Sequence, residues 1–409
     1  MGKVMFGGEI SSAAKGALEE IIRTRIQGIL ADVLEEELEQ FLERMSSGYR
    51  SDGKEAVTRN GYHRERVIQT TMGAVIAKVP RTRNHHGGEN FRSALVPPYK
   101  RNSRTFEGAV CELYLQGVST GKIGPLLKEL FGEAANDLSP ASITRLTAKW
   151  QEEFAVWNKR DLSDKEYCYV WVDGIHFNVR IGEEKLCTLV VVGATKEGDK
   201  ELIAVEGGYR ESAESWSVLL RDLRARGLKV PKLFIGDGSL GFWRAARDVY
   251  PEARNQLCWV HKTANVLDKL PKKLQAKAKS MVHEIYLAAT RDDAINAYKR
   301  FVAVFGAKYP NAVASIDDHF DMLFAFYDFP AEHWKHIRTT NPIESTFSTV
   351  RLRTKTTRGQ GSLTTTLAMV FKLAMEAAKG WRALDGSKLI LKIYDPKIIF
   401  VDGVEKAAA

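Results

Sequence analysis

The stretch that decides the fold is EYCYVWVDGIHFNVR (residues 166–180), which is apolar on both faces up to a single carboxylate, Asp173. Beyond it, the apolar residues Ile175, Phe177 and Val179 alternate with polar ones. A continuous apolar run is typical of a strand buried on both faces, whereas alternation is typical of a strand with one solvated face. The stretch therefore predicts a central strand that emerges toward the edge of a sheet and carries a carboxylate.

The pattern after this strand predicts a mixed sheet with helices on its faces. KLCTLVVVGAT (residues 185–195) and KELIAVEG (200–207) are predicted to form two further strands, linked by hairpins. KLFIGD (232–237) and NQLCWV (255–260) are predicted to form short buried strands, each following an amphipathic helical segment. Hairpin-linked strands followed by strand–helix alternation indicate an α/β fold with a mixed sheet.

Two carboxylates stand out in this sheet. A buried charge at Asp173 is costly unless it meets a cation or strong hydrogen-bond donors. Asp237 ends an apolar strand between Gly236 and Gly238, which let a ligand or a backbone approach closely. Because α/β proteins bind ligands at strand ends, both acids are candidates for a functional site. The alternatives are a buried structural hydrogen bond for Asp173 and a helix N-cap or turn for Asp237.

A third carboxylate follows in NPIESTFSTVRLRT (residues 341–354). Asn341 is predicted to cap a helix that has Pro342 at its first position, so Glu344 can also be interpreted as a capping carboxylate. However, Arg351 lies seven residues further on, on the same helical face as Glu344. An acid beside arginines that bind phosphate is the arrangement that metal-assisted phosphodiester chemistry requires.

Three carboxylates suit hard divalent cations. Mg²⁺ prefers oxygen ligands and uses few carboxylates together with substrate phosphate. Two such ions about 4 Å apart can activate the attacking oxygen and stabilise the leaving oxygen of an in-line displacement. We therefore expect Asp173, Asp237 and Glu344 to be catalytic and to bind two Mg²⁺ (or Mn²⁺) ions.

The distribution of charge favours a polyanionic partner. The chain of 409 residues carries a formal net charge of +9. Residues 50–107 hold twelve basic and five acidic side chains, and residues 351–382 hold seven basic and one acidic. Since each neutralised phosphate releases counterions, two concentrated basic segments suit DNA. The alternative for either segment alone is a solvated, charged surface.

Three long blocks resemble the bacterial Mutator-type insertion-sequence transposases, a family with a DDE triad on an RNase H-like core. They are VDGIHFNVR around Asp173, GDGSLGFWRAARDVYPEARNQLCWVHKTANVLDKLPKKL after Asp237, and FPAEHWKHIRTTNPIESTFSTVRLRT around Glu344. The resemblance extends over nearly the whole chain. Position by position, it places the triad on these same three acids.

The resemblance implies an RNase H-like α/β core that an all-helical insertion interrupts before Glu344. It also implies a DNA transposase that binds terminal inverted repeats, cleaves the element ends and transfers them to target DNA, with circular intermediates formed by a copying route. Because two double-stranded ends must be brought together, we expect a homodimer or a higher homo-oligomer. A non-enzymatic DNA-binding regulator, or a nuclease or resolvase on the same core, remains the alternative.

Cys258 and His261 match a Cys-x-x-His element of this family. A structural zinc ion would need two further ligands, for which His333 and His336 are the candidates, but a buried cysteine and a DNA-contacting His261 fit the same pattern. The expected contacts to DNA phosphates near the acids come from the basic residues of the last block, together with the imidazole. These DNA-binding candidates are His261, Arg351, Arg353, Lys355 and Arg358.

The expected organisation is a chain of seven segments. These are an amphipathic helix that is a candidate for oligomerisation (1–48), a basic β-containing DNA-binding region (49–104), a helical, helix-turn-helix-like DNA-binding region (105–160), the first part of the core (161–270), the helical insertion (271–336), the last part of the core (337–385) and a strand-like C-terminal tail (386–409).

The sequence also predicts a location. No stretch approaches the ~20 apolar residues of a membrane span, and the N-terminus lacks the pattern of a signal peptide. The four cysteines show no pairing rhythm, as in a reduced protein. We therefore expect no membrane partner, and a bacterial cytoplasmic protein that associates with the nucleoid when bound to DNA.

Overall fold

The computed structural model divides the chain into two units, Met1–Thr147 and Ala148–Ala409. The residues that it describes are 12–46, 53, 55–115, 118, 120–131, 140–178, 185–208, 212–238, 240–344, 347–348, 350–351 and 363–408. Among the helices in these ranges, none combines the length and the apolar character that crossing a bilayer requires.

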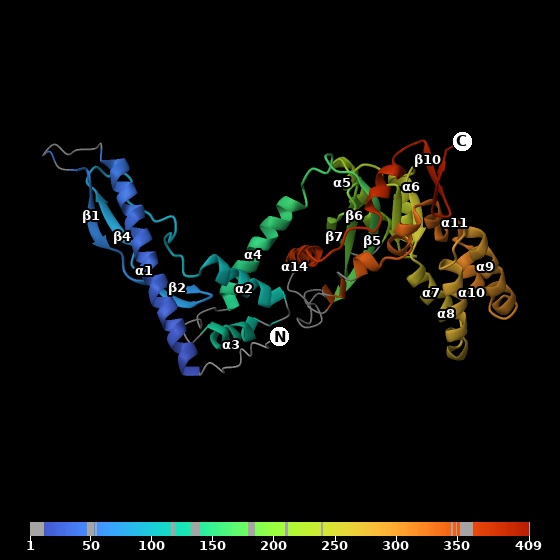
Figure 1. The fold of residues 1–409 in the computed structure, drawn as a ribbon, viewed down its shortest axis with the longest axis horizontal. Coiled ribbons are helices and arrows are strands. Elements are labelled where there is room, and N and C mark those ends of the chain that lie inside the picture. The colour runs from blue at the N-terminus through green and yellow to red at the C-terminus, as the bar shows by residue number, and fades with distance from the viewer. Residues whose placement is uncertain are drawn as a thin grey trace, which may run out of the picture. The chain divides into compact units, whose positions relative to one another are not determined.

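The second unit is built on a five-stranded sheet in the order β7-β6-β5-β8-β9 (Figure 1). Its strands are β5 (Tyr167–Asn178), β6 (Lys185–Thr195), β7 (Lys200–Gly208), β8 (Leu233–Gly236) and β9 (Arg254–Leu257). β6 pairs antiparallel with β5 and β7, whereas β8 pairs parallel with β5 and β9. The predicted mixed α/β sheet is confirmed, with the Asp173 strand at its centre.

Two helices connect the parallel strands. α5 (Ala213–Ala225) begins at Ser212, whose hydroxyl accepts a hydrogen bond from a backbone amide of the first turn, and it leads into β8. α6 (Leu240–Val249) then leads into β9. The rings of Trp216 and Phe242 pack edge to face, 5.0 Å apart, and join the two helices in a fully apolar contact.

A block of helices lies in the chain between β9 and Glu344. It comprises α7 (Trp259–Asp268), α8 (Lys272–Tyr286), α9 (Arg291–Phe305), α10 (Pro310–Asp317), α11 (Phe320–Leu323), the 3-10 helices η2 (Ala325–Asp328) and η3 (Ala331–His333), and α12 (Trp334–Ile337). Gln256 of β9 is fully buried, and its amide donates to the carbonyl of Leu323 and accepts from the amide of Phe326. The buried amide thereby ties the end of the block back to the sheet.

The C-terminal residues 363–408 complete the second unit. α14 (Leu363–Ala378) contacts β7 and α4 (Pro140–Trp157), with Phe371 against Phe154 and Trp157. The remaining elements are η4 (Ser387–Leu389), α15 (Ile390–Ile393), β10 (Ile398–Val401) and β11 (Val404–Ala407). The predicted strand-like tail is therefore wrong for residues 387–393. It holds for the last hairpin, whose turn residues Asp402 and Gly403 both have positive φ.

The first unit packs a long helix against short strands. α1 (Ser12–Met45) is one helix, and Leu34, Leu38 and Phe41 are buried in a core with residues of the strands. The other elements are β1 (Val57–Tyr62), β2 (Arg66–Thr70), β3 (Gly73–Ala77), β4 (Pro80–Asn84), α2 (Arg104–Leu115) and α3 (Thr120–Phe131). Thr71 and Met72 form the turn between β2 and β3, because Thr70 already pairs with Gly73.

The end of α5 depends on a glycine, which generates a stability prediction. Gly227 has φ +93°, and a β-carbon there would lie 2.8 Å from Cα of Ser163. The amides of Gly227 and Leu228 satisfy the last carbonyls of α5. Gly227→Ala should therefore lower the free energy of unfolding by about 1–3 kcal/mol, measured by urea denaturation. Gly380→Ala, where the added carbon meets only an ordinary contact at 3.6 Å, is the control and should change it by less than about 0.5 kcal/mol.

Candidate active site

The register of the parallel strands aligns the first two acids. Trp171 of β5 pairs with Ile235 of β8. Asp173 and Asp237 each lie two residues beyond these partners. Because side chains of paired residues share one face and the period is two, this register, if continued, sets Asp237, the residue directly after β8, on the same face as Asp173.

The two acids lie in different surroundings. Asp173 is 8% exposed, and its Oδ1 accepts the amide of Gly174 at 2.8 Å. Asp237 is half-buried, and its carbonyl accepts the indole N–H of Trp243 at 2.8 Å. A β-carbon on Gly236 would lie 2.9 Å from a methyl group of Val172, so the two strands can approach closely only with glycine at this position.

Glu344 lies in the first turn of a short helix that begins after Thr340. The amides of Ile343 and Glu344 donate to the carbonyl of Thr340, and residues 341–344 are helical. Thr340, and not Asn341, is therefore the N-cap, and Glu344 is the fourth helical residue instead of the third. The Thr340 hydroxyl donates to Oε1 of Glu344 at 2.8 Å.

Hydrogen bonds attach this turn to the end of β9. The amide of Cys258 donates to the carbonyl of Gly236, which continues the pairing of β8 with β9 by one residue. The fully buried Thr340 donates through its amide to the sulfur of Cys258, and its hydroxyl lies at the same 3.3 Å from that sulfur. The Glu344 turn thus lies beside the ends of β8 and β9, which Asp237 and Cys258 directly follow.

His261 lies within electrostatic range of two of the acids. Its Nε2 is 3.8 Å from Oε1 of Glu344. A hydrogen bond with Cys258 raises the pKa of His261 to about 9 against the opposing effect of burial, and the charges of Cys258, Asp173 and Glu344 add to the rise. Burial raises the pKa of the Cys258 thiol, but hydrogen bonds with His261 and Thr340 outweigh it and lower the pKa overall.

The predicted zinc ligands do not assemble. Within the described ranges, the potential metal ligands that approach within 4.8 Å are Cys258, His261 and Glu344. The ring of His333 is instead buried between the hydroxyl of Tyr169, at 2.7 Å, and the carbonyl of Gly386, at 3.0 Å. His336 Nε2 accepts the amide of Asp385, so both histidines hold the C-terminal segment. The predicted set of four zinc ligands is therefore wrong, because His333 and His336 do not lie with Cys258 and His261.

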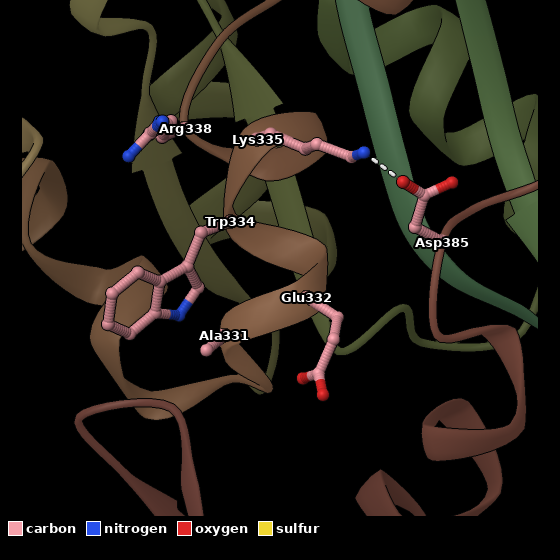
Figure 2. A pocket seen from close by; sticks show the side chains of 6 residues that line it. All are labelled: Ala331, Glu332, Trp334, Lys335, Arg338 and Asp385. Carbon is pink, nitrogen blue, oxygen red and sulfur yellow. Dashed lines mark hydrogen bonds and ion pairs between the residues drawn. The ribbon is translucent and has the colours of Figure 1, made fainter. Parts of the chain in front are cut away.

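A shallow cavity of about 350 Å³ lies elsewhere on the second unit. Its lining comes from η3, α12 and the segment after α14, namely Ala331, Glu332, Trp334, Lys335, Arg338 and Asp385 (Figure 2). Lys335 and Asp385 form an ion pair across it. The cavity contains none of the three acids, so it is separate from the candidate active site.

Among the predicted DNA-binding residues that follow Glu344 in the sequence, Arg351 belongs to the residues that the structure describes. It is exposed, and its guanidinium lies over the ring of Phe347, 5.7 Å from the centre. Arg353, Lys355 and Arg358 lie outside the described residues. Sequence reasoning missed Thr340, although a Thr directly before Asn-Pro is a recognisable N-cap signal.

Comparison with known proteins assigns the class. The family model for transposases of the Mutator family matches residues 8–383. The transposase of insertion sequence element IS6120 from Mycolicibacterium smegmatis is 54% identical over 68% of this chain and 86% of that protein. The transposase of element IST2 from Acidithiobacillus ferrooxidans is 46% identical over 68% of this chain and 94% of that protein.

Among solved structures, the catalytic core domain of the HTLV-2 integrase in complex with magnesium aligns with 32% of this chain and 92% of that chain. At 17% identity and a TM-score of 0.18, this likeness supports no conclusion about the chain. The family model and the sequence relatives define the protein as a transposase. The chain belongs to the Mutator family of transposases.

The Thr340 hydroxyl generates a stability prediction. Thr340→Val keeps the shape but removes the donor to Glu344, which should lower the free energy of unfolding by about 1–3 kcal/mol. Thr340→Ser keeps the hydroxyl and loses one methyl group, so it should cost about 1 kcal/mol. Urea denaturation of the two variants compares these values, and a valine variant that is more stable than the serine variant would contradict the hydrogen bond.

The Cys258–His261 contact generates a pH prediction. Because folding raises the pKa of His261 from 6.5 to about 9, its stabilising contribution is complete below pH 6.5 and is lost as the pH rises through 9. The ring of His261 should therefore titrate near pH 9 by NMR, and Cys258→Ala should move the midpoint toward 6.5. His319, whose pKa is lowered by burial and by Lys262, is the internal control. An unchanged His261 midpoint in the alanine variant would exclude the thiol as the cause.

Proposed function

We propose that this chain is a DNA transposase that cleaves element ends and joins them to target DNA through Asp173, Asp237 and Glu344. The observation that carries the proposal is that Asp237 directly follows the strand that pairs with the Asp173 strand, while Glu344 is linked through Thr340 to Cys258 at the end of the next strand. We further propose that the core is RNase H-like and that the helical block before Glu344 is an insertion into it.

The three carboxylates suit two Mg²⁺ or Mn²⁺ ions, because they offer hard oxygen ligands. Such ions, when bound, supply the activation of the attacking oxygen and the stabilisation of the leaving oxygen of a phosphodiester. The chain itself contributes position. Asp173 is fixed in the central strand, and the parallel pairing of β5 with β8 holds the strand that precedes Asp237 beside it.

We assign phosphate contacts to the cations around the acids. His261 is positively charged at neutral pH because its pKa is about 9, and 39% of its side chain is exposed. Arg351 is exposed on the Glu344 segment. Together with Arg353, Lys355 and Arg358, these residues are proposed to hold the DNA backbone at the site.

The first unit is proposed to bind the terminal inverted repeats. On β4, the exposed Arg81 and Arg83 flank the buried Thr82, so the outer face of this strand is basic. Residues 50–107 as a whole have an excess of seven positive charges. Such a surface binds DNA through counterion release. Since two ends must be paired, the active form is proposed to be a homodimer or a higher homo-oligomer.

The test uses a labelled element end and the full chain. Asp173→Asn, Asp237→Asn and Glu344→Gln should each reduce Mg²⁺-dependent nicking by roughly 1,000-fold, about 4 kcal/mol of transition-state free energy, while end binding persists. Glu284→Gln, which removes an exposed carboxylate of α8, is the matched control and should cleave normally.

Each rival function gives a different result in this assay. Variants that keep every activity of the parent would indicate a non-enzymatic regulator. Cleavage without strand-transfer products on a paired-end substrate would indicate a nuclease or a resolvase.

A further inference from the structure

The cluster of Cys258, His261 and Glu344 offers a ligand set that does not suit Mg²⁺. Its sulfur, nitrogen and oxygen donors all lie within 4.8 Å of one another. Thiolate and imidazole are the preferred ligands of Zn²⁺ and related thiophilic cations, whereas Mg²⁺ selects oxygen. The cluster therefore differs in chemistry from the carboxylate site, with which it shares Glu344.

The three donors lie around the hydroxyl group of Thr340. The hydroxyl oxygen of Thr340 lies 2.8 Å from Oε1 of Glu344. The same oxygen lies 3.3 Å from the sulfur of Cys258 and 3.4 Å from Nδ1 of His261. Ligands bound tetrahedrally to zinc lie about 3.3–3.8 Å from each other, and Nε2 of His261 is already 3.8 Å from Oε1 of Glu344. All three donors lie within 4.8 Å of one another, so an ion bound by all three would lie beside the Thr340 hydroxyl.

The site has an entrance and a balanced charge. The sulfur of Cys258 is buried, but the side chains of His261 and Glu344 are 39% and 31% exposed, so an ion can enter from their side. A thiolate and a carboxylate neutralise a divalent cation, and the neutral imidazole completes the set. The thiol and the imidazole give up to solvent whatever protons they carry when the ion binds.

We propose that Cys258, His261 and Glu344 form a three-ligand site for a thiophilic divalent cation such as Zn²⁺, and that its occupation inhibits the transposase by withdrawing Glu344 from the Mg²⁺ ions. The claim that the site binds a metal ion depends only on the arrangement of Cys258, His261 and Glu344. The claim that the bound ion inhibits the enzyme rests on the proposed function, because it requires Glu344 to take part in catalysis. A zinc site with three protein ligands keeps a fourth position for water, so the ion remains exchangeable with the medium.

Binding is tested with Co²⁺, which adopts the same geometry and gives a near-ultraviolet charge-transfer band only with a thiolate ligand. The full chain and Cys111→Ser, a control in the first unit, should both show the band, and Cys258→Ser should lose it. His261→Gln should keep the band but raise the dissociation constant for Co²⁺ at least about tenfold. A parent chain without the band, or a band that persists in Cys258→Ser, overturns the proposal.

Inhibition is tested in the nicking assay at fixed Mg²⁺ by titrating Zn²⁺. The zinc concentration for half inhibition should rise at least about tenfold in Cys258→Ser relative to its own zinc-free rate, and should be unchanged in Cys111→Ser. Equal zinc sensitivity in the parent and Cys258→Ser overturns the claim that the bound ion inhibits the enzyme. A parent chain that never nicks DNA refutes the proposed function and the inhibition with it, whereas the cobalt spectrum still decides whether the site binds metal.

Discussion

The parallel pairing of β5 with β8 and of β8 with β9 is the constraint on which the candidate active site depends. Parallel neighbours end at the same edge of a sheet, so residues far apart in the chain become level there. Asp237 and Cys258 directly follow β8 and β9, and Asp173 lies within the adjacent β5. A shift of β8 by one residue would turn Asp237 to the opposite face, and the alignment with Asp173 would be lost.

A second constraint holds Glu344, which arrives from a different part of the chain. The helical block between β9 and Glu344 can deliver this residue only if both of its ends are fixed to the sheet. Gln256 holds the block through Leu323 and Phe326, and Thr340 holds its exit through Cys258. These anchors are fully or almost fully buried polar groups, so leaving any of them unpaired would carry the full cost of desolvation.

The same edge of the sheet carries two chemistries. The carboxylates are hard ligands, and the thiol and imidazole beside them are softer ones, with Glu344 common to both sets. Electrostatics also couples them, because the charges of Asp173 and Glu344 help to keep the imidazole of His261 protonated. A cation beside the acids suits a site whose substrate is a polyanion.

The sequence by itself determined the local elements and the class. Period-two and continuous apolar patterns predicted the strands of the mixed sheet, including the central one with Asp173. They could do so because the burial of a strand determines which of its consecutive residues are apolar. Three ordered sequence blocks sufficed to predict the family. Only the tertiary structure decided which groups meet. Cys258 and His261 face Glu344 and Thr340, while His333 and His336 hold the C-terminal segment, and residues 387–393 are helical. These contacts of Cys258 and the three histidines join positions 49 or more apart in the chain, and local periodicity does not identify a partner at that distance.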